Sequence, residues 1–198
     1  GSLVNTMQPG FAARSAVLSI NLAQEGMRGP RDVLEGKYGY YQLFEGGSYQ
    51  TEPILSGLGD RYEVENLRYK PFPSGSLTHG AVEAAIRLRN NYGVKPQEIL
   101  GVTVTAPELN VRLVGRPPVN GGMTTQGARL CLPLCVAFAL LRGDVWVRDF
   151  EGVALEDENV YELASRVEVV VNPDITDPNV SSPVFVEVRT NEGTIRDE

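Results

Sequence analysis

The longest apolar run of the sequence extends from Leu130 to Leu141, and it limits the folds that the chain can adopt. A helix over these residues is apolar on every side, which is typical of a helix inside a protein core. The run is shorter than the roughly 20 residues that a membrane-spanning helix requires. We therefore expect a helix that the rest of a domain covers on most sides.

Cys131 and Cys135, the two cysteines of the chain, lie one turn apart in this helix. A structural zinc site would need further Cys or His ligands, and a disulfide across one turn would constrain little. We expect two buried free thiols, as in the reducing cytoplasm, and the N-terminus has no signal-peptide pattern. The expected location is cytoplasmic.

Sequence patterns after residue 60 predict strands alternating with helices. Helical periodicity is found over Leu77–Asn91 and Glu158–Arg166. The strand candidates alternate or are rich in valine, and they are Ile99–Thr105, Val167–Asn172, Val184–Thr190 and, in addition, Tyr62–Tyr69 and Leu109–Val114. We expect an α+β domain over residues 66–198, with a mostly antiparallel sheet packed on two main helices.

Residues 1–65 have a helical character instead. Phe11–Gln24 has helical periodicity, and Arg31–Glu35 and Glu52–Leu58 are predicted as short helices. The chain begins abruptly, and a hairpin turn after Thr190 leads into a strand that has scarcely begun at Glu198. We therefore expect a fragment of a larger protein, in which residues 1–65 are part of an all-helical domain.

The charge of the chain excludes some classes of partner. The net charge is −7 and the isoelectric point about 4.9, and the basic residues form no cluster. This composition argues against nucleic acid or an anionic membrane surface as the main partner. A small anionic substrate remains possible, because a local pocket can be positive on an acidic protein.

The stretch from Lys70 to His79 carries the candidate chemistry. It places the only histidine nine residues after a lysine, with two prolines and a Ser/Gly-rich turn between them. The prolines favour extended backbone, so Lys70 is predicted to end a strand, and Ser76 or Thr78 to cap the helix that follows. A helix N-terminus attracts carboxylates and keeps a nearby imidazole neutral, so His79 can act as a base. We predict that Lys70 and His79 converge on one carboxylate, with hydroxyl donors from Ser76 and Thr78.

An ordinary structural interpretation competes with this one. A Pro/Ser/Gly connection before a capped helix is common in αβ architecture, and a single histidine more often has a structural role or faces solvent. Three further cations, Arg112, Arg116 and Arg129, lie in or near Gly115–Gly127, which is predicted to be a mobile loop. Exposed arginines usually only solvate a surface.

Five stretches, in order along the chain, carry a resemblance to a known family: Leu3–Ser15, Gly29–Gly36, Gly57-Leu58-Gly59, Lys70–His79 and the helix with Leu132-Pro133. They resemble the MmgE/PrpD family, which includes 2-methylcitrate dehydratase, cis-aconitate decarboxylase and iminodisuccinate epimerase. The resemblance covers nearly the whole chain.

The resemblance implies a large helical domain, a smaller α+β lid and an active site between them. It also implies cofactor-free chemistry on small di- or tricarboxylic acids, with proton removal next to a carboxylate, in a homodimer. Lys70 falls on the lysine of the family's lid, and His79 on a histidine that ends the same motif. We expect a hydro-lyase of the 2-methylcitrate dehydratase type, inactive as these 198 residues alone.

Three positions depart from the family pattern. Asn5 and Gln8 stand where the family usually has a lysine and a histidine, and Gly75 where it often has Cys or His. Asn5 and Gln8 can still offer neutral hydrogen bonds to a substrate, which are weaker than charge-assisted ones. The alternatives are an epimerase or decarboxylase of the same family, or a diverged dimerisation or binding module without catalysis.

Overall fold

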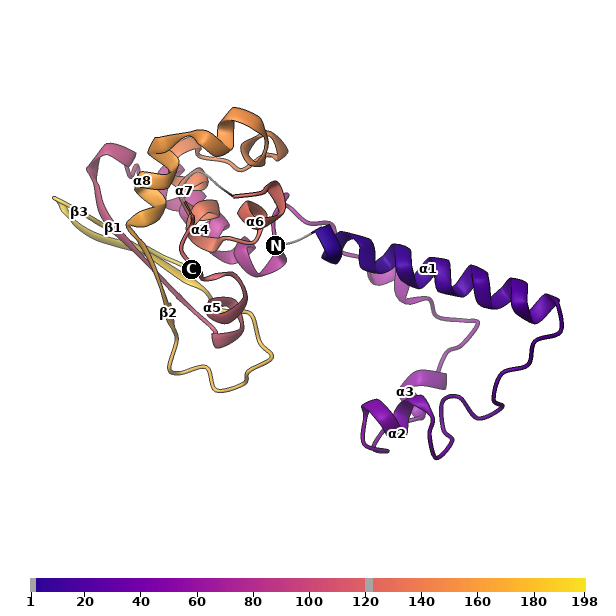
Figure 1. Ribbon diagram of the computed structural model, residues 1–198. Coiled ribbons are helices and arrows are strands. Elements are labelled where there is room, and N and C mark those ends of the chain that lie inside the picture. The colour runs from indigo at the N-terminus through magenta and orange to yellow at the C-terminus, as the bar shows by residue number, and fades with distance from the viewer. Residues whose placement is uncertain (1–2, 120–122) are drawn as a thin grey trace. The chain divides into compact units, whose positions relative to one another are not determined.

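The computed structural model describes residues 3–119 and 123–198 (Figure 1). The chain divides into two units, one of residues 70–198 with the first residues of helix α1, and one of residues 6–69. No helix in the described part of the chain is long and apolar enough to cross a membrane.

The unit of residues 6–69 is helical and has no strand. It contains most of α1 (Leu3–Gln24), α2 (Tyr40–Phe44), α3 (Glu52–Leu55) and the 3₁₀ turn η1 (Glu63–Asn66). Aromatic side chains pack locally around α2, where the rings of Tyr41 and Tyr49 stack with centroids 4.1 Å apart. Of residues 6–69, all of which the structure describes, only Gly39 is buried.

The helix predicted over Phe11–Gln24 is confirmed, but its start and two further predictions for residues 1–69 are wrong. Helix α1 begins at Leu3 rather than at Phe11 and accommodates Pro9. Residues 31–35 form turns, because the Val33 and Leu34 carbonyls accept from the amides of Tyr40 and Tyr41 at the start of α2. Tyr62–Tyr69 forms η1 and irregular backbone, since no neighbouring strand buries one of its faces.

The unit of residues 70–198 is the predicted α+β fold. Strands β1 (Ile99–Ala106), β2 (Val167–Val171), β3 (Phe185–Thr190) and β4 (Gly193–Asp197) form a sheet in the order β2-β1-β3-β4. The β1–β2 pair is parallel and the β1–β3 and β3–β4 pairs are antiparallel, so the sheet is mixed but mostly antiparallel. The hairpin predicted after Thr190 joins β3 to β4.

Alternation along the strands decides which side chains enter the core. Val186 and Val188 of β3 are fully buried, while Glu187 and Arg189 between and after them are exposed. In β1 the pattern shifts at Leu100, where the pairing with β3 jumps from Ile99 to Gly101. This bulge lets Ile99 and Val102 both face the core.

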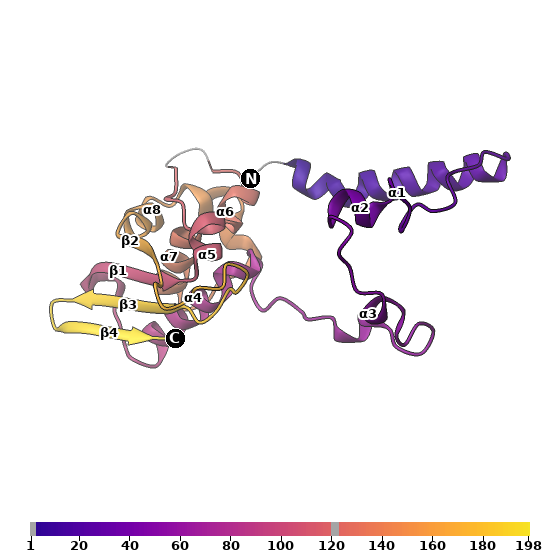
Figure 2. The same ribbon diagram turned by 90° about the horizontal axis from the view of Figure 1, so that it is seen from below.

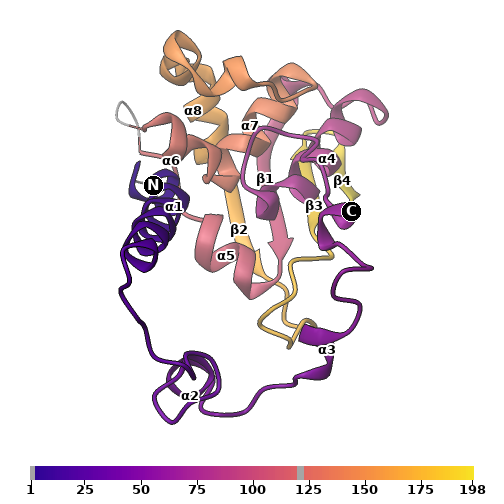
Figure 3. The same cartoon turned by 90° about the vertical axis from the view of Figure 1, so that its right-hand side faces the viewer.

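Three α-helices cover one face of this sheet: α4 (His79–Asn90), α7 (Leu132–Arg142) and α8 (Glu158–Ser165) (Figure 2). They lie side by side in the order α4-α7-α8 (Figure 3). Every residue of α7 from Leu132 to Leu140 is buried, which confirms the prediction for the apolar run. Gly143 ends α7 in the left-handed conformation, at φ 76°.

Short helices connect these elements: η2 (Ser76–Thr78), η3 (Pro96–Glu98), α6 (Thr125–Arg129), η4 (Val147–Phe150) and η5 (Gly152–Glu156). Leu109–Val114 is helix α5 (Glu108–Val114) rather than a strand, because Pro107 starts a helix whose Asn110 and Val114 are buried one turn apart. Part of the predicted loop over 115–127 lies outside the described residues, at 120–122, and its last residues begin α6.

Candidate functional site

The stretch from Lys70 to His79 forms a compact turn before α4. Residues 70–75 have no regular structure, so the strand predicted to end at Lys70 is absent. The turn then forms η2, and α4 begins at His79. The Gly75 amide donates to the Arg129 carbonyl at 2.8 Å, which ties the turn to the end of α6.

Lys70 and His79 meet at a single atom, the carbonyl oxygen of Ser74. The Lys70 Nζ lies 3.5 Å from this oxygen and the His79 Nε2 lies 3.3 Å from it. A carbonyl oxygen can only accept, so the His79 Nε2 carries the proton in this contact. The structure thus brings the amine and the imidazole together.

The imidazole is half-buried beside Phe72, whose ring meets it edge-on with centroids 5.6 Å apart. Burial lowers the pKa of His79 below its ordinary 6.5, and the Lys70 ammonium lowers it further. The Ser74 and Phe72 carbonyls favour the protonated ring, but burial outweighs them. A neutral His79 was expected, although from the helix terminus rather than from burial.

Neither Ser76 nor Thr78 caps α4, so this prediction is wrong. The Thr78 hydroxyl instead lies 2.8 Å from the Ser74 Oγ and donates to the Gly75 carbonyl at 2.8 Å. Thr78 is fully buried, whereas Ser76 is exposed. Local hydrogen bonds to the turn itself replace the cap, as hydroxyl side chains often do.

Both cysteines are free and buried, as predicted. Burial raises the pKa of Cys131 to about 11 and raises that of Cys135 still further. Cys135 lies close enough to Ser74 and Thr78 for their hydroxyls to favour its thiolate slightly. Such strongly raised pKa values are typical of inert structural thiols.

The other candidate residues lie outside the Lys70–His79 stretch of the sequence. Gln8 is exposed in α1, in the unit of residues 6–69, and the Asn5 side chain lies outside the described part of the structure. Arg112 and Arg116 are exposed. The Arg129 guanidinium lies 3.6 Å from Glu151 and over the ring of Phe150. The substrate contacts predicted for Asn5 and Gln8 remain predictions.

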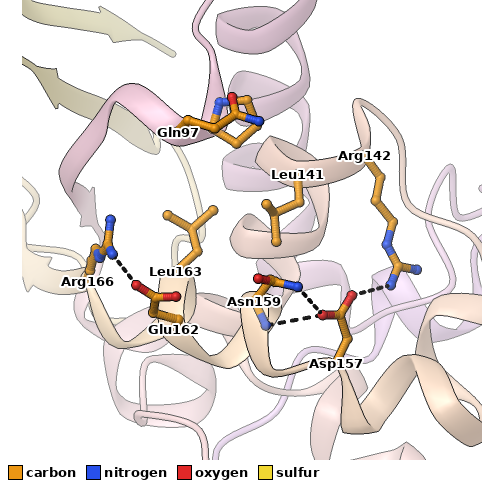
Figure 4. A pocket seen from close by; sticks show the side chains of 9 residues that line it. Gln97, Leu141, Arg142, Asp157, Asn159, Glu162, Leu163 and Arg166 are labelled. Carbon is orange, nitrogen blue, oxygen red and sulfur yellow. Dashed lines mark hydrogen bonds and ion pairs between the residues drawn. The ribbon is translucent and has the colours of Figure 1, made fainter.

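A cavity of about 530 Å³ lies elsewhere, at the C-terminal end of α7, whereas the turn lies near the N-terminal end (Figure 4). Its charged groups already have partners within the chain. Arg142 pairs with Asp149 and Asp157, and Arg166 pairs with Glu162. The other Asp157 oxygen accepts from the Asn159 amide. Among the described residues that line this cavity, both cations are thus paired with carboxylates.

Sequence reasoning missed two residues of the turn's framework. The Ser74 carbonyl is the meeting point of both side chains, and its hydroxyl bonds to Thr78. Asn110 of α5 donates to the Leu77 carbonyl at 2.8 Å. No sequence signal marked Asn110, because the segment was interpreted as a strand. Within the described residues, no group of three or more His, Cys, Asp or Glu side chains is arranged to hold a metal ion.

Two family models match the sequence. The model of the MmgE/PrpD C-terminal domain matches residues 72–198, and that of the MmgE/PrpD N-terminal domain matches residues 2–52. The first of these matches includes α4, α7 and the complete sheet, together with most of the turn.

Curated relatives give a consistent picture. A cis-aconitate decarboxylase-like protein of Aspergillus oryzae is 26% identical over 98% of this chain and 43% of its own length. The cis-aconitate decarboxylase of Aspergillus terreus is 35% identical over 46% of this chain and 20% of its own. The human cis-aconitate decarboxylase is 26% identical over 83% of this chain and 34% of its own. The chain thus spans less than half the length of these relatives.

Proposed function

Because this chain belongs to the MmgE/PrpD family, we propose that its Lys70–His79 turn is the carboxylate-binding part of a lyase or decarboxylase site. The substrate class is small di- or tricarboxylic acids. One observation carries the proposal: the Lys70 Nζ and the His79 Nε2 both reach the Ser74 carbonyl oxygen, at 3.5 and 3.3 Å. Two donors directed at one oxygen are the arrangement that a carboxylate requires.

The Ser74 carbonyl holds these donors only loosely. Both contacts exceed the distances of about 2.7–2.9 Å that are usual between a cation and a carboxylate. A substrate carboxylate would therefore replace two long contacts with shorter, charge-assisted ones, each about twice as strong as a neutral hydrogen bond. Lys70 is exposed and His79 only half-buried, so both groups are accessible.

The relatives favour decarboxylation over the dehydration that we expected from the sequence, since all those reported above are named as cis-aconitate decarboxylases or as similar to them. In decarboxylation the bond between a carbon atom and one carboxylate breaks and carbon dioxide leaves. The electron pair stays on the carbon, which must take up a proton. We assign His79 the role of proton donor and Lys70 that of binding a carboxylate that remains.

Substrate binding itself would prepare His79 for this role. A carboxylate beside the imidazole favours the charged ring and opposes the effects of burial and of Lys70 on its pKa. The ring is then neutral in the free protein and takes up a proton as the acid binds. We assign Thr78 a positioning role rather than substrate contact, because its hydroxyl is enclosed within the turn.

A second candidate is a protein that binds carboxylates without turnover. Gly75 favours it, because this position is often Cys or His in the family. A Cβ atom at Gly75 would come within 2.8 Å of the Leu130 Cδ2. A larger side chain at this position would therefore require Leu130 to move, and Gly75 itself offers no titratable group.

Binding can be measured by NMR, because His79 is the only histidine and gives a single set of imidazole signals. Titration with cis-aconitate or 2-methylcitrate should shift these signals, and the neutral trimethyl ester of cis-aconitate should not. Lys70→Ala should weaken binding about tenfold, which is the loss of one charge-assisted contact. Lys95→Ala, which removes an exposed lysine paired with Glu98, is the matched control and should bind as the wild type does. Equal binding by Lys70→Ala and Lys95→Ala would refute the proposal.

Turnover separates the two candidates. Each acid is incubated in deuterated water, and carbon dioxide release and deuterium incorporation are followed with the wild type, Lys70→Ala and His79→Gln. Activity that both substitutions abolish supports the decarboxylase. The same experiment is repeated with a protein of the relatives' length that contains this chain. If the acid binds at the turn in both proteins, and neither releases carbon dioxide nor incorporates deuterium, the binding protein is supported.

A further inference from the structure

Asn110 is a buried amide on α5 that contacts two backbone segments distant from it in sequence. It is only 1% exposed. Its Nδ2 donates to the Leu77 carbonyl at 2.8 Å and to the Ser181 carbonyl at 3.3 Å. Leu77 lies in η2, two residues before His79, and Ser181 lies in the segment between β2 and β3.

We propose that Asn110 is a positioning residue for His79, which it holds by fixing the η2 turn against the segment that precedes β3. The inference rests on the proposed function, because it concerns the same turn. It assigns Asn110 no contact with the substrate.

The orientation of the Asn110 amide is determined by its neighbours. Both neighbours are carbonyl oxygens, which can only accept, so the NH₂ group must face them. The amide oxygen is consequently buried and has no hydrogen-bond partner among the described residues. Leaving a buried acceptor unpaired destabilises the folded state, so its presence calls for a reason other than stability. Bridging two carbonyls is a task that an apolar side chain of the same size cannot perform.

Asn110 completes a set of three attachments around the turn. The Gly75 amide holds one side to the Arg129 carbonyl, and the Thr78 hydroxyl closes the turn on Gly75. Asn110 holds the Leu77 carbonyl, two residues before the residue that carries the imidazole. Without it, η2 could move away from α5, and the His79 Nε2 would lose its position at the Ser74 carbonyl beside Lys70.

The prediction is tested on the His79 imidazole signal itself. In the folded protein the ring is surrounded by Phe72, the Ser74 carbonyl and the Lys70 ammonium, which together with burial set its titration midpoint. Asn110→Ala should raise this midpoint by roughly 0.5 pH unit or more, because a loosened turn exposes the ring to water. Affinity for cis-aconitate should fall several-fold in the same variant.

Asn172→Ala is the matched control. Asn172 is also a buried asparagine, 8% exposed, but it accepts from the Asp174 amide, and none of its hydrogen bonds among the described residues involves the turn. In Asn172→Ala the titration midpoint of His79 should remain that of the wild type, even if this variant loses as much stability in urea as Asn110→Ala does. An unchanged midpoint in Asn110→Ala, or an equal shift in Asn172→Ala, would overturn the inference.

Asn110→Ser provides a second test if Asn110→Ala does not fold. Its shorter hydroxyl can reach at most one of the two carbonyls, so a smaller upward shift is expected, and no shift contradicts the inference. The titration needs no substrate. A wild type that binds no acid would refute the proposed function, while the midpoints would still decide whether Asn110 positions His79.

Discussion

At the scale of single residues, the chemistry of this protein depends on one carbonyl oxygen that two side chains share. Lys70 and His79 lie in a short, proline-containing stretch, so local backbone geometry alone brings them close. Their convergence could therefore be predicted from the sequence. The acceptor could not, because every residue of the turn has a backbone carbonyl and no sequence pattern distinguishes that of Ser74.

Lys70→Ala should raise the pKa of His79 towards its ordinary 6.5, because the ammonium disfavours a second positive charge beside it. The imidazole signal followed by NMR between about pH 5 and 8 measures the midpoint. Lys95→Ala should leave it unchanged. A midpoint in Lys70→Ala that stays constant or falls would show that the two charges do not interact.

The stability of the protein should depend on pH through His79. Its pKa is lower in the folded state than the unfolded value of 6.5, so the unfolded chain binds more protons in this range. The neutral ring contributes fully to the stability of the fold above about pH 6.5, and this contribution is lost as the pH falls through the pKa of His79 in the folded state. The difference in unfolding free energy between the wild type and His79→Gln should therefore shrink from about pH 7 to pH 5 in urea titrations. A difference that is constant with pH would contradict the assignment.

At the scale of elements, the turn is shaped by its contact with the junction between α6 and α7. Gly75 is needed there for space and not for an unusual backbone conformation, because its φ is −64°. Sequence reasoning recognised Gly75 as a departure from the family but could not show that Leu130 fills the space. Such a compensation joins residues 55 positions apart and appears only once the elements pack.

Gly75→Ala should destabilise the protein by about 1 kcal/mol, the low end of the cost of overpacking, because the added methyl group must displace the end of the partly buried Leu130 side chain. The cost should be much smaller when Leu130 is also alanine. Gly80→Ala is the control, since its Cβ would meet Val184 at an ordinary 3.4 Å and alanine favours a helix. Urea unfolding of the wild type, Gly75→Ala, Leu130→Ala and the double variant gives the coupling between Gly75 and Leu130. Purely additive losses would argue against direct overlap.

The end of α7 is held by an ion pair that should matter for stability. Asp149 is buried and accepts from the Trp146 amide while pairing with Arg142. Arg142→Ala leaves this carboxylate without its cation and should cost about 3 kcal/mol. Lys95→Ala removes an exposed pair with Glu98 and should cost less than about 1 kcal/mol. Similar losses in the two variants, measured by urea unfolding, would contradict the distinction.

At the scale of the whole molecule, the two units differ in how much core they contain. Residues 70–198 enclose a continuous set of buried side chains from α4, α7 and the sheet. Apolar residues of α1 remain exposed, among them Phe11 at 49% and Ile20 at 58%. The homodimer that we expected from the sequence stays a prediction, and these side chains are where it can be tested.

Amide hydrogen exchange should reveal this difference. We expect slow exchange in α4, α7, β1 and β3, because opening them exposes core residues, and fast exchange in residues 6–69. Mass spectrometry of peptides, at two protein concentrations, measures the exchange rates of both units. Protection of α1 that increases with concentration would support a second copy covering its apolar residues. If α1 were as strongly protected as α4 at every concentration, our interpretation of residues 6–69 would be contradicted.

The sequence by itself determined the elements whose patterns are local and strong. The apolar run of α7, the alternation of β1 and β3 and the proline-containing turn carry their own signals, since each reflects a side-chain period or a fixed backbone angle. Only the tertiary structure decided that residues 108–114 are a helix, that Thr78 faces inward and that Leu130 occupies the space beside Gly75. These outcomes depend on contacts between segments that are far apart in the sequence, and the local periodicity of hydrophobic residues contains no information about such contacts.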